Sequence, residues 1–209
     1  MATTSLILGT RNAHKVEELV RMLPGFPLPI RSLRDFQRAP EVVEDAPTFR
    51  GNAEKKALTL AAALGQPVLA DDSGLEVDAL DGRPGVRSHR YAGPRATDAE
   101  NTRKVLDEMV SVPEPLRQAR FRCALALALP DRIVATVEGV VEGLLLREPR
   151  GTGGFGYDPI FLFPPLDRTF AQLSPEEKNR VSHRARALDE IRPHLLAFAS
   201  LLNPVPVRA

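Results

Sequence analysis

The first part of the chain alternates short apolar runs with stretches whose apolar residues recur at helical spacing. Such alternation of strands and helices predicts an α/β sheet with at least some parallel pairing. The first expected elements are a strand at Ser5–Leu8 and a helix that begins at Asn12, with Val16, Leu19, Val20 and Leu23 on one face. After them come an irregular stretch from Ile30 to Pro40, a strand end at Val42–Asp45, a helix from Thr48 to Leu64 capped by Gly65, and a strand at Val68–Ala70.

The pattern changes after a Gly- and Pro-rich loop at Leu80–Ala96 and a helix expected from Thr97 to Met109. The segment "RFRCALALAL" alternates with period two, and after "PDR" follows "IVATVEGVVEGLLL". This pattern predicts a long antiparallel hairpin. A short strand is expected at Ile160–Phe163. Ser182 is expected to cap a final helix, which Pro193 should kink or break.

The parallel-looking halves and the central hairpin suggest two lobes with a cleft between them. Residues 1–202 are expected to form this single domain, and residues 203–209 a frayed tail.

Composition narrows the function classes. The chain has 28 Lys and Arg against 27 Asp and Glu, a formal net charge of +1, which argues against binding of long nucleic acid. The single cysteine, Cys123, excludes an internal disulfide and fits a reducing compartment. Neither a leader nor an apolar run near the roughly 20 residues of a membrane span is recognised. A cytoplasmic location is therefore expected.

The segment "VLADDSGLEV" places Asp71 and Asp72 directly after an apolar run. Adjacent carboxylates disfavour each other's ionisation, so a metal ion, a substrate proton or water should compensate. Carboxylates at the end of a strand lie where α/β folds bind ligands, and with Glu44 they suit Mg²⁺. The alternative is a turn, because Asp-Ser-Gly is ordinary turn chemistry.

Three other segments carry candidate chemistry. "TRNAHK" (Thr10–Lys15) offers donors and a lysine at a helix N-terminus, which favours an anion. Taken alone, however, this segment is better explained as a helix cap with a solvated lysine. Lys56 follows Asn52 by four residues, so both project from one side of a helix. "GTGGFGYDP" supplies Phe155 and Tyr157 for stacking on a flat ring and Asp158 as an acceptor.

A final polar set lies near the last helix, where Lys178 precedes Ser182-His183-Arg184. The sequence motifs of a Walker A loop, a Ser-His-Asp triad and a zinc site do not occur in the chain. Together the segments supply an anion loop, a candidate metal site, lysines and an aromatic slot. A nucleoside triphosphate needs this combination.

The motifs "TRNAHK", "TFRGNAEKKA", "LADDSGLEVDAL", "RPGVRSHRYAG", "GTGGFGYDPIF" and "SPEEKNRVSHR" occur in one order from about Ser5 to Ile191. In the presence and order of these motifs, the chain resembles the Ham1/RdgB/inosine triphosphatase family of pyrophosphatases, which act on non-standard purine nucleoside triphosphates. The resemblance implies an inosine triphosphatase-like α/β fold, which is an elongated mixed sheet flanked by helices, in two lobes around a substrate cleft. Members of the family are usually homodimers. It also implies hydrolysis of ITP, dITP and XTP to the monophosphate and pyrophosphate with Mg²⁺. Arg11 and His14 depart from the residues that the family often has.

The resemblance also implies roles for single residues. Lys56 would contact the phosphates, Asp72 would accept the proton of the attacking water with Asp71 in support, and Glu44 and Asp72 would bind Mg²⁺. Substrate would be bound by Thr10, Arg11, Asn12, Ala13, His14, Lys15, Ser73, Phe155, Gly156, Tyr157, Asp158, Lys178, His183 and Arg184.

Two alternatives of other kinds remain. One is a nucleotide- or RNA-binding module without catalysis, against which the near-zero net charge and the full carboxylate set both count. The other is a related pyrophosphatase that prefers modified pyrimidines or bulk nucleotides.

Overall fold

The computed structural model describes residues 4–202, and the expected tail at 203–209 lies outside the described residues. The chain divides into two compact units. Of the described residues, the first unit holds 4–72, 124–138 and 187–202, and the second holds 73–123 and 139–186. Each unit is described by itself below. The substrate cleft predicted from the sequence stays a prediction.

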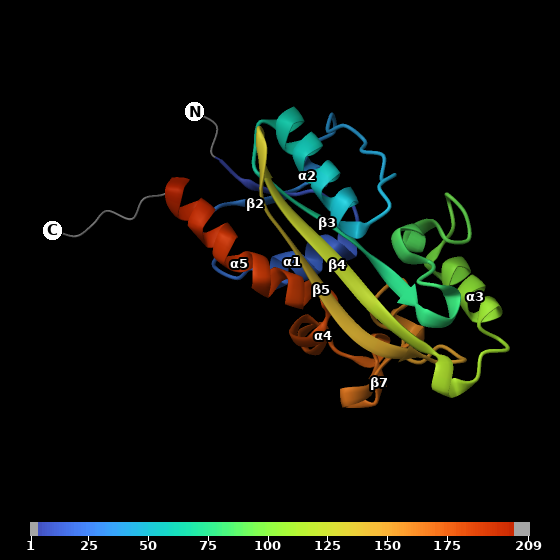
Figure 1. The fold of residues 1–209 in the computed structure, drawn as a ribbon. Coiled ribbons are helices and arrows are strands. Elements are labelled where there is room, and N and C mark those ends of the chain that lie inside the picture. Colours follow the sequence, from blue (N-terminus) through green and yellow to red (C-terminus); the bar gives the residue numbers. More distant parts are fainter. Residues whose placement is uncertain (1–3, 203–209) are drawn as a thin grey trace. The chain divides into compact units, whose positions relative to one another are not determined.

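The strands of the described residues form one mixed sheet in the order β2-β1-β3-β4-β5-β6-β7 (Figure 1), which confirms the predicted fold class. Their bounds are β1 Leu6–Leu8, β2 Ile30–Ser32, β3 Val68–Val77, β4 Gln118–Leu129, β5 Arg132–Leu145, β6 Phe161–Phe163 and β7 Arg168–Thr169. The α-helices are α1 Ala13–Met22, α2 Phe49–Leu64, α3 Asp98–Glu108, α4 Pro175–Val181 and α5 His183–Leu202. Short 3₁₀ helices are η1 Leu33–Asp35, η2 Asp78–Leu80, η3 Gly85–Arg90, η4 Glu114–Leu116, η5 Asp158–Ile160, η6 Pro164–Leu166 and η7 Phe170–Gln172.

The first unit contains the parallel part of the sheet. β1 pairs in parallel with β2 on one side and with β3 on the other, in the register Ile7↔Val68 and Leu8↔Leu69. All three residues of β1 are fully buried. The crossovers through α1 and α2 run in opposite directions along the sheet, and right-handed crossovers of this kind place the two helices on opposite faces. The predicted parallel pairing is thus confirmed.

α2 and α3 begin and end where the sequence predicts. The Thr48 hydroxyl accepts a hydrogen bond from the Gly51 N–H at 3.0 Å, and Gly65 ends α2 in the left-handed region with φ +62°. Thr97 caps α3 in the same way and shares a capping box with Glu100.

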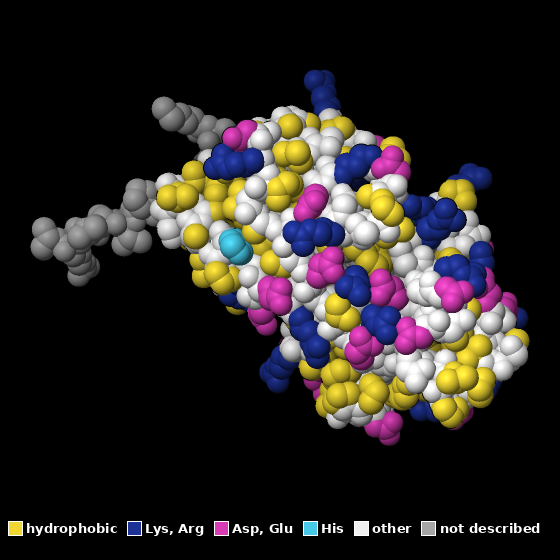
Figure 2. All heavy atoms as spheres, viewed as in Figure 1, with side chains coloured by type: hydrophobic (Ala, Val, Ile, Leu, Met, Phe, Trp, Pro, Cys, Tyr) yellow, Lys and Arg dark blue, Asp and Glu magenta, His cyan; other side chains and the backbone are white. Residues whose placement is uncertain are grey.

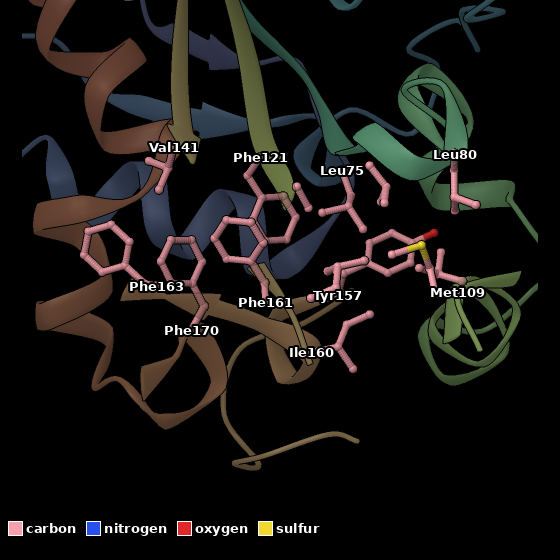
Figure 3. Packing of buried hydrophobic residues seen from close by; sticks show 14 of the residues in the cluster. Leu75, Leu80, Met109, Phe121, Val141, Tyr157, Ile160, Phe161, Phe163 and Phe170 are labelled. Carbon is pink, nitrogen blue, oxygen red and sulfur yellow. The ribbon is translucent and has the colours of Figure 1, made fainter. Parts of the chain in front are cut away.

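The second unit has an aromatic core. Phe121, Phe161 and Phe170 pack together with ring centroids 4.6 to 5.8 Å apart (Figure 3). Aliphatic residues of β3, α3 and β5 extend the cluster, among them Leu75, Val105 and Val141. The antiparallel pairs β5–β6 and β6–β7 close this end of the sheet. The long pattern of period two forms β4 and β5 as predicted, joined only by Pro130 and Asp131.

Four local expectations were wrong. β3 does not stop at Ser73 but continues to Val77. The stretch from Ile30 contains β2, and Val42–Asp45 forms no strand. Ser182 caps the final helix as predicted, since its hydroxyl accepts a hydrogen bond from the Ala185 N–H at 3.2 Å. A further short helix, α4, precedes it with Ser174 as its cap.

The fourth concerns Pro193, at which α5 is not broken (Figure 1). A proline inside a helix removes one backbone hydrogen bond. Burial of apolar residues on both sides, Leu188, Ile191 and Leu195, outweighs that loss.

None of the described helices is long and apolar enough to cross a membrane. On the face drawn in Figure 2, basic and acidic side chains are interspersed and do not separate by sign.

Candidate active site

The two adjacent aspartates lie inside β3, just beyond the residues that pair with β1. Asp71 is 1% exposed and Asp72 5%. Successive side chains of a strand point to opposite faces of the sheet, so the two carboxylates point away from each other. The long strand thus removes much of the repulsion that the sequence suggested, and each carboxylate finds its own partner in the first unit.

Asp71 is paired with Lys15 of α1. The position of Lys15 is fixed at the start of that helix, where the Asn12 side chain accepts hydrogen bonds from the N–H groups of His14 and Lys15 at 3.0 and 3.3 Å. Thr10 supports this cap, since its hydroxyl accepts from the Asn12 N–H at 3.2 Å. The segment is therefore both a helix cap and the support of a lysine beside an acid.

Asp72 faces α2. The side-chain amide of Asn52 donates a hydrogen bond to the Asp72 carboxylate at 2.9 Å, and Asn52 is fully buried. One turn further along α2, Lys56 pairs with Glu44. The side-chain oxygen of Asn52 also accepts a hydrogen bond from the Ala46 N–H at 2.9 Å. This bond connects the segment that carries Glu44 to the same helix.

The environment of Asp72 raises its pKa from 3.8 to about 6. Burial is the largest cause because it penalises the charged carboxylate, and the negative charge of Glu44 adds to it. The charges of Lys15 and Lys56 and the hydrogen bond from Asn52 oppose the increase. An acid with a pKa near neutrality, surrounded by lysines, is suited to accept a proton.

Glu44 and Asp72 fit a hard divalent cation in part. Both supply carboxylate oxygens, and Glu44 affects the pKa of Asp72 through its charge. Within residues 4–202, no group of three or more His, Cys, Asp or Glu side chains is arranged to hold a metal by itself. Mg²⁺ usually keeps waters and takes phosphate oxygens, so two protein carboxylates suffice when the substrate supplies the rest.

The second unit gathers two cations around one aromatic ring. The Lys178 ammonium lies 4.6 Å and the Arg184 guanidinium 5.8 Å from the centroid of Phe155. Both basic residues are buried, Arg184 completely. Arg184 also donates a hydrogen bond to the Ser73 hydroxyl at 2.9 Å, and Lys178 is paired with Asp158. Buried cations beside an aromatic face are suited to a flat, electron-rich ring with acceptor atoms.

Other residues expected at the base are engaged differently. The ring of Tyr157 lies in the apolar cluster (Figure 3) and its hydroxyl donates to the Ser88 carbonyl at 2.8 Å. Burial raises the pKa of Tyr157 above its usual value. Asp158 accepts from the Phe155 N–H at 2.9 Å, and His183 stacks on Phe121 at 4.8 Å.

Each unit thus brings together part of the predicted set. The first assembles Lys15, Glu44, Lys56, Asp71 and Asp72, and the second assembles Ser73, Phe155, Asp158, Lys178 and Arg184. The Arg11 guanidinium donates to the Ala39 carbonyl at 3.0 Å. The sequence predicts only that Asn52 lies on the same side of the helix as Lys56, because the two residues are four positions apart. It does not predict the contact between Asn52 and Asp72.

The chain is similar to known proteins over most of its length. The Ham1 family model matches residues 6–194. A dITP/XTP pyrophosphatase of Syntrophobacter fumaroxidans is 52% identical over 90% of this chain and 80% of its own length. One from Geobacillus kaustophilus is 50% identical over 89% and 91%. A HAM1 protein structure from Coxiella burnetii matches with a TM-score of 0.82 and 39% identity, over 97% of this chain and all of that one. The chain therefore belongs to the Ham1 family.

Proposed function

We propose that this protein hydrolyses ITP, dITP and XTP to the nucleoside monophosphate and pyrophosphate, and so clears deaminated purines from the nucleotide pool. The observation that carries the proposal is the buried carboxylate of Asp72, whose pKa lies near 6 and which Lys15, Lys56 and Glu44 surround. The names of relatives about half identical to the chain support the same substrates.

In this proposal the first unit handles the phosphates. Thr10–Lys15 and Lys56 bind the triphosphate, since lysines and the N–H groups at the start of α1 favour negative charge. Asp72 accepts the proton of the water that attacks the α-phosphorus, and Asn52 orients its carboxylate. Asp71 keeps Lys15 in place through their ion pair.

Glu44 and Asp72 are proposed to hold Mg²⁺. When bound, this ion neutralises charge that develops on the phosphate oxygens. Because Glu44 is already paired with Lys56, substrate binding would redistribute the partners of both groups.

The second unit is proposed to recognise the base. Phe155 stacks on the purine, and Lys178 and Arg184 present donors at the edge of its ring. Hypoxanthine and xanthine carry an oxygen at the 6-position, which accepts hydrogen bonds, whereas adenine carries an amino group there. Adenine would leave buried donors unpaired, which disfavours its binding. Ser73 takes part through the hydroxyl that already accepts from Arg184.

We also propose that the enzyme acts as a homodimer in the cytoplasm. The family resemblance supports the dimer, and the single cysteine, which is buried, fits a reducing compartment. Light scattering coupled to size-exclusion chromatography tests the dimer, because a monomer at working concentration contradicts it.

The activity is tested by measuring pyrophosphate release from dITP, XTP, dATP, dGTP and dUTP with Mg²⁺. We expect dITP and XTP to be hydrolysed with the highest kcat/KM. A lack of release from every nucleotide would overturn the enzymatic proposal, and a preference for dUTP would overturn the purine assignment.

A further inference from the structure

Two residues of α3 hold Gly156, the residue that follows Phe155 in the Gly-rich loop. The Asp98 carboxylate accepts a hydrogen bond from the Gly156 N–H at 2.7 Å. The Thr102 hydroxyl donates to the Gly156 carbonyl at 3.3 Å. Asp98 and Thr102 are four residues apart and thus lie on one side of α3. Both backbone polar groups of Gly156 are therefore bound by a single helix.

The conformation at Gly156 makes this contact important. Its φ is +60°, a region that residues with a side chain rarely adopt. The chain turns sharply at Gly156, so the backbone conformation there affects the orientation of the adjacent Phe155 side chain. Glycine has more backbone freedom than any other residue, so external contacts must select this one conformation.

The backbone of Phe155 itself is held by contacts within the Gly-rich loop. Its N–H donates to the Asp158 carboxylate at 2.9 Å, and its carbonyl accepts from the Asp158 N–H at 3.2 Å. Phe155 thus lies between a contact inside the loop and the contact with α3. Asp158 is itself paired with Lys178, but Asp98 belongs to an element without any residue in the proposed base site.

We infer that Asp98, assisted by Thr102, is a positioning residue that holds the Phe155 loop in the conformation that stacks on the purine base. The inference rests on the proposed function. Asp98 does not act on the substrate itself, since its carboxylate is bound to the loop backbone. Its charge strengthens the contact because a hydrogen bond to an ionised group exceeds a neutral one.

A role through Phe155 has a specific kinetic signature. Stacking contacts the face of the base and not its polar edge, so every purine nucleotide depends on it alike. Loss of Asp98 should raise KM for dITP and for dATP by the same factor and leave kcat unchanged. Inorganic tripolyphosphate has no base, so its inhibition constant against dITP should stay as in the wild type.

The experiment compares Asp98→Ala with Asp98→Asn and Glu100→Ala. Asp98→Ala should raise KM by about three- to tenfold, the range for a single hydrogen bond that is exposed to solvent. Asp98→Asn keeps an acceptor oxygen and should recover most of the loss. Glu100→Ala is the matched control, because Glu100 stabilises the same helix end but bonds only Thr97, and its KM should not change.

A double-mutant cycle with Phe155→Ala decides whether Asp98 acts through the ring. In the Phe155→Ala background, Asp98→Ala should cause no further rise in KM. Independent, multiplying effects would overturn the inference. So would a fall in kcat at unchanged KM, or equal effects of Asp98→Ala and Glu100→Ala.

The loop itself can be followed without any reaction. Amide hydrogen exchange of the peptide around Gly156 should be faster in Asp98→Ala and unchanged in Glu100→Ala. Unchanged exchange in Asp98→Ala overturns the positioning role even in an active enzyme. A wild-type protein that releases no pyrophosphate from dITP overturns the proposed function instead, and exchange then still tests the contact.

Discussion

The Asn52 amide donates a hydrogen bond of 2.9 Å to the carboxylate of Asp72, and neither residue is more than 5% exposed. This contact opposes the burial that raises the pKa of Asp72 to about 6. Asn52 therefore both orients the acid and favours its charged form. That form is the one that accepts a proton.

Asn52→Ala should raise the pKa of Asp72 further, because a hydrogen bond to the charged form is lost. The acidic limb of the profile of kcat/KM against pH should move to higher pH by about half a unit or more. The measurement is this profile at one fixed Mg²⁺ concentration for both proteins.

Asn101→Ala is the matched control for this experiment. Asn101 is also buried, but its side chain bonds the backbone of Ala92 and His89 and not a carboxylate. Its loss should lower stability and leave the acidic limb in place. An acidic limb that stays fixed in Asn52→Ala contradicts the role given to Asn52.

Asp72→Asn should make the metal-free protein more stable at neutral pH. The pKa of the folded state, about 6, lies above the usual 3.8, so the folded protein holds the proton more tightly than the unfolded chain. This favourable effect is complete below pH 3.8, falls as pH rises, and is gone above about 6. The gain from Asp72→Asn in the free energy of unfolding should therefore grow from pH 4.5 to 7 and reach at most about 3 kcal/mol.

Denaturant unfolding with a chelator present measures this gain across the same pH range. Asp71→Asn is the control of opposite sign, because it removes the charged acceptor from the ion pair with Lys15 and should cost about 1 to 3 kcal/mol. A loss of stability in Asp72→Asn at pH 7 is the result that this account does not allow.

Lys178 and Asp158 should behave as a coupled pair in unfolding experiments. Their side chains are only 5% and 4% exposed, so Lys178→Met removes a cation from beside a buried carboxylate and should cost about 3 to 5 kcal/mol. The double variant Lys178→Met/Asp158→Asn should regain most of this, because asparagine keeps an acceptor for the Phe155 N–H. A double variant as unstable as the single one would show that the pair is not coupled.

The same double variant should lose discrimination between bases. Without the Lys178 donor, the ratio of kcat/KM for dITP over dATP should fall by about tenfold, the value of one well-made hydrogen bond. Lys55→Met removes the same charge from an exposed position and is the control that should keep the ratio. An unchanged ratio in the double variant would separate Lys178 from base selection.

Local patterns predicted most of the fold, but they predicted only part of the structure around the two aspartates. Periodicity and caps located α2, α3 and the β4–β5 hairpin, because those signals lie within a few residues. The sequence also indicated Asp71 and Asp72 as candidate site residues, but it placed them at the end of a strand. Their continuation into β3 follows from sheet pairing, which "DDSG" does not encode locally.

The contacts that sequence could not predict connect distant segments. Tyr157 is amphipathic, and only packing decided that its ring joins the core and its hydroxyl reaches Ser88, 69 residues away. Asp98 carries no motif and reads as an ordinary first-turn acid. Its bond to Gly156, 58 residues later, depends on where α3 packs.

The proposed role of Asp72 is to drive attack of water on the α-phosphorus. Its most direct test is hydrolysis of dITP in water enriched in the heavy isotope of oxygen, with mass analysis of both products for the wild type and for Asp72→Asn. We predict that the wild type places the label in dIMP and leaves pyrophosphate unlabelled, and that Asp72→Asn forms almost no product while remaining folded. Label in pyrophosphate, release of orthophosphate, or an active Asp72→Asn enzyme would contradict the account.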